Sequence, residues 1–182
     1  MKKTLKIIGI LFLISILLRG FLFRLCVNYT AIGNRTEIPV THPKLIKAIE
    51  TIANNQSINF RTIPQIASNI TTENLDFISQ STSRNSNQVF KTRQANCIGY
   101  SALFHSVTQY LIKKYQLEQE IDSKHLIGKL DFLGLDLHQF FQSPFFKDHD
   151  FNQIKNLKTG ESIYIDPSLR DYLGIKTVSC KN

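Results

Sequence analysis

The longest helix that the sequence predicts spans residues 97–114 and reads CIGYSALFHSVTQYLIKK. Asn96, directly before it, is a favourable N-cap residue, and Lys113 and Lys114 in the last turn complement the helix dipole. Apolar residues recur along it at helical spacing, namely Ile98, Ala102, Leu103, Val107, Tyr110 and Leu111. This pattern predicts a helix that is buried along one face and that begins at Cys97.

Shorter elements are predicted before this helix. Residues 43–54 have apolar residues at helical spacing, and Pro43 suits a first helical turn. Residues 64–69 and 72–80 are predicted as two short helices, and residues 81–88, which read STSRNSNQ, as a polar loop. The N-terminal half of the domain is therefore expected to be helical.

Strands are predicted after the long helix. Residues 125–137 have mixed strand character, and residues 149–154 and 162–167 are predicted as a pair of short strands. The connector between that pair, residues 156–160, has the polar and glycine content of a hairpin turn. Helices first and strands later predict an α+β domain, with the long helix packed on an antiparallel sheet.

The N-terminus predicts a membrane anchor. Three lysines in the first six residues precede an uncharged, mostly aliphatic run over residues 7–18, and Arg19 and Arg24 interrupt the apolar sequence that follows. We expect residues 1–27 to be an uncleaved signal-anchor or transmembrane segment, in preference to a cleaved signal peptide, because no small-x-small cleavage pattern follows Leu18. Residues 28–40, with Gly33 and Pro39, are interpreted as a linker to a domain over residues 41–182 that lies outside the cytoplasm.

The charge of the chain belongs mainly to this segment. The net charge is +8, and six of the 22 basic residues, but none of the acidic ones, precede residue 36. The remainder is almost balanced, so the sequence does not predict a basic surface for nucleic acid.

Cys97 is a candidate nucleophile. The chain has three cysteines, and Cys97 lies in the middle of the globular part, far in sequence from Cys26 and Cys180. At the first turn of a helix, unpaired backbone N–H groups and the positive end of the dipole favour the thiolate. The N–H of Cys97 is in addition a candidate donor to an oxyanion, with the side chain of Gln88 or Gln94 considered as a second donor.

The predicted hairpin supplies a base and a carboxylate. His149 and Asp166 would face each other across the two strands if the turn were centred between Leu157 and Lys158, which lies inside the predicted connector. Opposed side chains on one face have Cβ atoms about 5 Å apart, so Asp166 would orient His149 and stabilise its cation. The sequence therefore predicts Cys97 as nucleophile, His149 as base and Asp166 as orienting carboxylate.

Three segments resemble the motifs of the transglutaminase-like superfamily. Residues 93–104, RQANCIGYSALF, resemble its nucleophile segment; residues 149–154, HDFNQI, its histidine strand; and residues 164–168, YIDPS, its aspartate strand. The resemblance implies a papain-like core and acyl chemistry at an amide or ester carbonyl through a thioester, with no metal or cofactor. The chain departs from the pattern at Asp150 and Gln153, and it has no tryptophan.

These observations predict a membrane-anchored or exported thiol enzyme that hydrolyses or transfers acyl groups at amide bonds of peptides, proteins or cell-wall material. The alternative is a binding or scaffold domain that keeps the fold without turnover. A further alternative is a metal site formed by His138, Asp148, His149 and Asp150, although no tight His-x-x-x-His pair supports it. The sequence does not indicate the oligomeric state.

Overall fold

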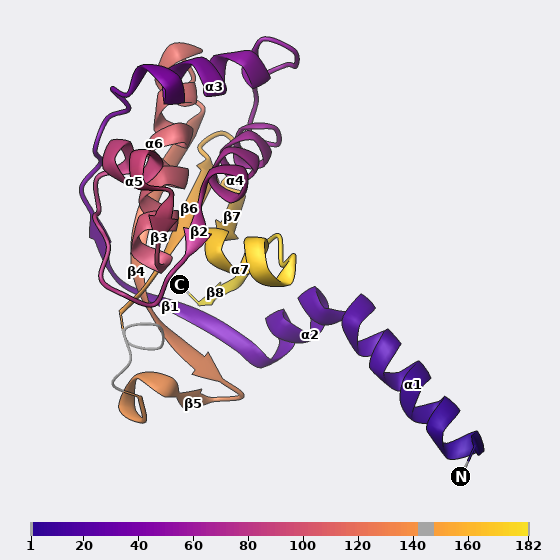
Figure 1. Ribbon diagram of the computed structural model, residues 1–182. Coiled ribbons are helices and arrows are strands. Elements are labelled where there is room, and N and C mark those ends of the chain that lie inside the picture. Colours follow the sequence, from indigo (N-terminus) through magenta and orange to yellow (C-terminus); the bar gives the residue numbers. More distant parts are fainter. Residues whose placement is uncertain (1, 142–147, 182) are drawn as a thin grey trace.

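The computed structural model describes residues 2–141 and 148–181 of the protein, which is a mixed α+β chain (Figure 1). Its main sheet has the strand order β7-β6-β4-β1-β8, and β5 pairs with the end of β4. Neighbouring strands are antiparallel except β1 and β8, which are parallel. The strands are β1 (Val27–Arg35), β4 (Ile121–Phe132), β5 (Leu135–Asp136), β6 (His149–Asn156), β7 (Ser162–Ile165) and β8 (Ser179–Lys181).

Helices surround this sheet, and a two-stranded parallel ladder of β2 (Asp76–Phe77) and β3 (Gln94–Ala95) lies apart from it. The helices of the described residues are α1 (Lys2–Leu17), α2 (Arg19–Cys26), α3 (Pro43–Ala53), α4 (Ile63–Asn74), α5 (Ser86–Thr92), α6 (Cys97–Lys114), η1 (Leu137–Gln139) and α7 (Pro167–Leu173). Four of these eight, α3 to α6, lie between β1 and β4 in the chain.

The helix predicted over residues 97–114 is confirmed as α6, with both ends as expected. It packs against α4 and against β4 and β6 of the sheet. Leu103, Phe104 and Val107 are fully buried at its centre, and burial of each such side chain contributes about 1.5–3 kcal/mol. A truncation such as Phe104→Ala would cost about 3–5 kcal/mol, so α6 is the helix on which the core depends.

The sheet separates two apolar clusters. The larger one joins α3, α4 and α6 to side chains of the sheet, among them Ile121 and Ile154. The smaller one contains Tyr29 of β1, Phe151 of β6 and Leu169 of α7. Gly128 of β4 is required here, because a Cβ atom at this position would lie 2.6 Å from the Phe151 ring.

The expected linker over residues 28–40 is wrong for residues 28–35, because they belong to β1. This strand pairs with β4 on one side and β8 on the other, and its Tyr29 is 1% exposed. The sequence of this segment does not predict a strand. Its place in the sheet depends on pairing with β4, which lies about a hundred residues later in the chain. The main sheet therefore begins at Val27, ahead of α3 to α6, and not after residue 40 as expected.

Two other boundaries differ from the predictions. The helix expected over residues 72–80 is absent, because α4 continues from Ile63 to Asn74 and β2 follows it. The loop expected over residues 81–88 ends early, because the side chain of Asn85 accepts hydrogen bonds from two backbone N–H groups and caps α5. Both corrections concern short elements, whose ends depend on local caps and pairing.

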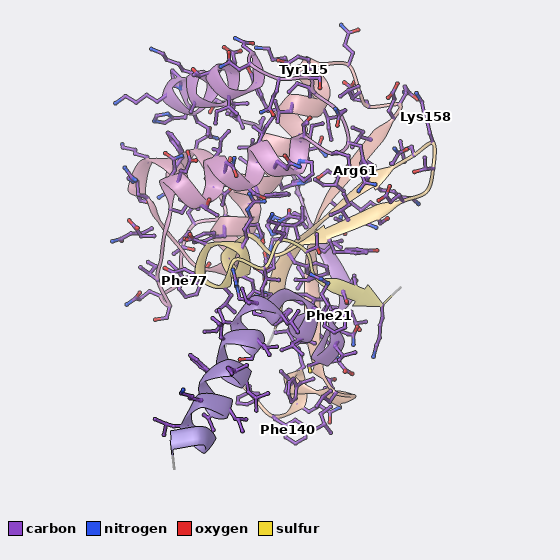
Figure 2. All side chains as sticks on the ribbon, turned by 90° about the vertical axis from the view of Figure 1, so that its right-hand side faces the viewer. Phe21, Arg61, Phe77, Tyr115, Phe140 and Lys158 are labelled. Atoms are coloured by element: carbon purple, nitrogen blue, oxygen red, sulfur yellow. The ribbon has the colours of Figure 1, made fainter. Side chains whose placement is uncertain are left out.

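The helices α1 and α2 project from the rest of the chain (Figure 1). Among the described residues no single helix combines the length and apolar composition needed to cross a membrane, whereas Leu5–Leu17 and Arg19–Cys26, bent by 73° at their junction, meet the criteria only as a pair. Arg24 donates to the backbone oxygen and the hydroxyl of Thr177, and Arg19 to the carbonyl of Leu173, so α2 is tied to the C-terminal part of the domain. Figure 2 shows Tyr115, at the end of α6, and Phe140, after η1, at opposite ends of the molecule.

Candidate active site

Cys97 is the first residue of α6, and its side chain is buried, with 3% of its surface exposed. Asn96 holds this helix end: its Oδ1 accepts from the N–H groups of Ile98 at 3.1 Å and Gly99 at 3.4 Å. Thr82 in turn donates to the same oxygen at 2.7 Å. The capping geometry thus fixes the position of Cys97 at the positive end of the helix dipole.

His149 and Asp166 lie side by side, as the hairpin predicts. Nε2 of His149 lies 2.5 Å from Oδ2 of Asp166, and both side chains are almost completely buried. Because a carboxylate can only accept, Nε2 carries the hydrogen. The register of the hairpin nevertheless differs from the prediction by two residues: Asn152 pairs with Ile165, so the turn is centred one residue later and Asp166 would extend the ladder opposite Phe151. A shift of two keeps every side chain on its predicted face, which is why the pair still meets.

Asp166 is the N-cap of α7 and lies just beyond β7, whereas the sequence predicted a strand that continued to residue 167. Its Oδ1 accepts from the backbone N–H and the hydroxyl of Ser168, at 3.0 and 2.6 Å, and from the N–H of Leu169 at 3.3 Å. Its Oδ2 accepts from the hydroxyl of Tyr29 at 2.9 Å as well as from His149. Burial alone would raise the pKa of Asp166, but the charge and hydrogen bond of His149, with the donors Ser168 and Tyr29, hold that pKa below its ordinary value.

His149 joins this carboxylate to the thiol. The His149 ring is hydrogen-bonded to Asp166, and Cys97 lies close enough for its sulfur to contribute to the rise in the pKa of His149. Because Nε2 faces Asp166, Nδ1 is the nitrogen left for the sulfur. Burial opposes the charged imidazole, yet the charge and hydrogen bond of Asp166, supplemented by Cys97, raise the pKa of His149 well above its ordinary value. An imidazolium beside the thiol is therefore the favoured form near neutral pH. We call Cys97, His149 and Asp166 the thiol cluster.

Two residues that support this cluster were not predicted from the sequence. Tyr29 bonds Asp166 and places its ring 5.8 Å from the His149 ring, edge to face. It lay in the expected linker, and a single buried residue in a strand gives no periodic signal. Ser168 did have a signal: an aspartate followed by Pro167 is the pattern of a helix N-cap with proline at the first helical position.

A second cluster begins at the next residue of β6. Asp150, which is fully buried, accepts two hydrogen bonds from Arg35, at 2.5 and 2.9 Å, and lies 2.7 Å from Nε2 of His125. We call Arg35, Asp150 and His125 the arginine cluster. Burial raises the pKa of Asp150, but hydrogen bonds from His125 and Arg35 outweigh it and leave that pKa below its ordinary value. The residue at which the chain departs from the transglutaminase-like pattern thus anchors an ion pair between three neighbouring strands.

The helix end also offers a donor for a developing oxyanion. Ile98 and Gly99 donate to the side chain of Asn96, and Tyr100 donates to its carbonyl. Within residues 2–141 and 148–181 no acceptor is found for the N–H of Cys97. Gln88 on α5 and Gln94 on β3, the side chains considered as a second donor, are both exposed.

The alternative of a metal site at His138, Asp148, His149 and Asp150 has no geometric support. In the described part of the chain, no three His, Cys, Asp or Glu side chains come together as metal ligands would. His149 and Asp150 point to opposite faces of the sheet and pair with different groups. In comparisons with protein-family models, with curated proteins and with solved structures, no match to the chain was found.

Proposed function

We propose that the chain is a membrane-anchored or exported thiol enzyme of the transglutaminase-like type, which hydrolyses or transfers acyl groups at amide bonds through a thioester. The observation that carries the proposal is the position of His149, whose ring lies 2.5 Å from Asp166 and near enough to Cys97, the first residue of α6, for that thiol to contribute to the rise in its pKa. A nucleophile, a base and an orienting carboxylate in contact are the arrangement that nucleophilic acyl transfer requires.

The first half of the reaction forms the thioester. The Cys97 thiolate attacks the carbonyl carbon, and the N–H of Cys97 is placed to stabilise the oxyanion. When the intermediate collapses, the C–N bond breaks and the imidazolium of His149 gives its proton to the leaving amine. The acyl group is then bound to sulfur, and His149 is neutral.

The second half releases the acyl group. A water molecule, or an amine in a transfer reaction, loses a proton to neutral His149 as it attacks the thioester carbonyl. The C–S bond breaks, the acid or new amide leaves, and the thiolate–imidazolium pair is restored. Asp166 stays ionised throughout, which its low pKa favours, and holds the imidazole in one orientation.

Two further features support the family and the location within this proposal. The order Cys97, His149, Asp166, with a helix that begins at the cysteine and packs on the sheet, is what the transglutaminase-like resemblance implies. The three leading lysines and the apolar run over residues 7–18 support an anchor that leaves the domain outside the cytoplasm. Peptides, proteins or cell-wall amides are the substrates that such a location makes available.

The test is alkylation of Cys97 by iodoacetamide across pH, in a full chain whose Cys26 and Cys180 are replaced by serine. The proposed ion pair requires a thiolate at pH 6.5, where a free thiol with a pKa of about 8.5 is only about 1% ionised. His149→Ala is therefore expected to slow alkylation at pH 6.5 about 100-fold. His138→Ala, a histidine substitution on η1, is the matched control and is expected to leave the rate unchanged.

One observation favours the alternative, a scaffold domain without turnover: Cys97, His149 and Asp166 together expose almost no surface. The same experiment separates the two functions. An alkylation rate that follows the titration of a free thiol and is indifferent to His149→Ala would identify the scaffold. A fast, histidine-dependent reaction at pH 6.5 would identify the enzyme.

A further inference from the structure

A polar cavity of about 160 Å³ adjoins the arginine cluster on the α6 side of the sheet. It is the size of a few water molecules, or of one small polar group of a ligand. Its walls come from β1 and the segment after it, from the loop before α5, from α6 and from β4. The lining residues are Arg35, Thr36, Glu37, Ile38, Arg84, Ala102, His105, Ser106 and His125.

The side chains that line this cavity carry an excess of positive charge, which comes from Arg84, because the charge of Arg35 is paired with Asp150. Arg35 and Arg84 both line it, and Glu37 is the acidic side chain among the lining residues. The Glu37 carboxylate is already neutralised by Lys113, whose Nζ lies 2.7 and 2.9 Å from its two oxygens. His105 adds no charge, because burial, with His125 and Lys113 nearby, lowers its pKa to about 3.

The guanidinium of Arg35 is positioned by Asp150 and keeps N–H groups that are available to a ligand. Asp150 accepts from Nε and from one Nη2 hydrogen, which uses two of the five N–H groups of the guanidinium. In the described part of the chain the other three have no acceptor, and Arg35 keeps 18% of its side chain exposed. Arg84 has no ion-pair partner within residues 2–141 and 148–181 and lies exposed on its loop. One arginine is thus fixed by a buried carboxylate, and the other is free to close on an anion.

The cavity lies near the thiol cluster. Ala102 and His105 are five and eight residues beyond Cys97 on α6, which corresponds to roughly 8–12 Å along the helix axis at 1.5 Å per residue. Asp150, which holds Arg35, follows His149 directly in β6, with its side chain on the opposite face of the sheet. An extended peptide spans this distance with two to three residues.

We propose that the cavity lined by Arg35 and Arg84 binds a carboxylate of the acyl substrate, two to three residues from the carbonyl that Cys97 attacks. The proposal rests on the proposed function and adds a substrate class, which is amides with a free carboxylate at that distance. Guanidinium groups bind carboxylates through paired, charge-assisted hydrogen bonds, which gives both affinity and register. The carboxylate comes from either a peptide C-terminus or an acidic side chain.

The test uses three thiol reagents of one length on the chain whose Cys26 and Cys180 are serine. Iodoacetyl-diglycine has a terminal carboxylate about 9 Å from its reactive carbon, its C-terminal amide is the neutral match, and iodoacetyl-glycyl-aspartyl amide has the carboxylate on a side chain. The better of the two charged reagents is expected to alkylate Cys97 about tenfold faster than the neutral one, which corresponds to about 1.4 kcal/mol. Which of the two is faster identifies the source of the carboxylate.

Substitutions then locate the preference. Arg84→Gln and Arg35→Lys are each expected to reduce the charged-to-neutral rate ratio at least threefold, whereas Lys91→Gln, an equal charge change on exposed α5, leaves it unchanged. Equal rates for charged and neutral reagents, with alkylation still dependent on His149, would overturn the carboxylate site alone. A ratio that survives both arginine substitutions would overturn it as well. Loss of the dependence on His149 would instead overturn the proposed function.

Discussion

Two histidine–carboxylate pairs contain consecutive residues of β6. One pair belongs to the arginine cluster, with a structural role, and the other to the thiol cluster, with a proposed catalytic role. His149 pairs with Asp166 at 2.5 Å, and Asp150 pairs with His125 at 2.7 Å. Both pairs are buried. Because successive residues of a strand point to opposite faces of the sheet, neighbours in sequence enter separate environments.

The third member of each cluster decides its chemistry. In the arginine cluster, the permanent charge of Arg35 balances the Asp150 carboxylate. In the thiol cluster, His149 itself is the cation that balances Asp166, and the proton it holds is available to Cys97. A histidine–aspartate pair therefore stabilises the sheet when it lies beside a guanidinium, and it is proposed to activate a nucleophile when it lies beside a thiol.

The largest effect expected from this contrast is on stability. Asp150→Asn removes a buried carboxylate and leaves the Arg35 guanidinium without its counter-charge, which is expected to lower the free energy of unfolding by about 3–5 kcal/mol. Urea unfolding at pH 7 measures this loss. The alkylation rate of Cys97 in the folded fraction is expected to stay within about threefold of the parent protein.

Asp122→Asn is the control for that experiment, because Asp122 is 40% exposed and its nearest cation, Lys124, is 3.9 Å away. It is expected to change the free energy of unfolding by less than about 0.5 kcal/mol. An Asp150→Asn protein as stable as this control would remove the structural role assigned to the arginine cluster.

The next effect concerns reactivity. Asp166→Asn replaces the charge that stabilises the imidazolium, while asparagine still caps α7. Alkylation of Cys97 at pH 6.5 is expected to fall about 100-fold, to the rate of a thiol that ionises alone. If this variant and Asp150→Asn slowed the reaction equally, the two clusters would not differ in the way proposed.

The third prediction concerns His105 and the dependence of the unfolding free energy on pH. Its folded-state pKa of about 3 lies below the unfolded value of about 6.5, because burial disfavours its charged form. The unfolded state binds a proton first as the pH falls, so stability present above pH 6.5 is lost progressively toward pH 3. From pH 7 to pH 5 this residue is expected to remove about 2 kcal/mol, at about 1.36 kcal/mol for each pH unit below 6.5.

His105→Gln is expected to flatten the dependence of the unfolding free energy on pH between 7 and 5 by that amount. Urea unfolding at the two pH values, with His138→Ala as the histidine control, measures the change. A slope that matches the parent protein would show that His105 titrates alike in both states.

The smallest effect is expected at Tyr29. Tyr29→Phe keeps the ring beside His149 but deletes one of the donors to Asp166, which is expected to lower the free energy of unfolding by about 1 kcal/mol. Because this donor lowers the pKa of Asp166, its removal raises that pKa, and stability is lost at a higher pH on acidification. Acid unfolding monitored by circular dichroism tests the direction. An unchanged acid transition would show that the remaining donors suffice.

Elements with strong local signals could be predicted from the sequence. The cap, the apolar stripe and the terminal lysines of residues 97–114 predict α6 with its observed ends. The two strands around residues 156–160 were also predicted, although their register was displaced by two residues. Side-chain alternation along a strand determines which face a residue points to, but not its partner on the next strand. His149 and Asp166 could therefore be predicted as a pair, and Cys97 from the start of the helix. The position of Asp166 at a helix cap was not predicted.

The sequence by itself determined which residues could be reactive: a cysteine at the start of a buried helix, and a histidine and an aspartate brought together by a short hairpin. Only the tertiary structure decided what surrounds them. Tyr29 reaches Asp166 from a strand 137 residues earlier in the chain, and Arg35 reaches Asp150 from 115 residues earlier. Caps and hairpins leave local patterns because their bonds join near neighbours. Pairing between distant strands gives no local sequence pattern, because the paired residues become neighbours only in the folded sheet.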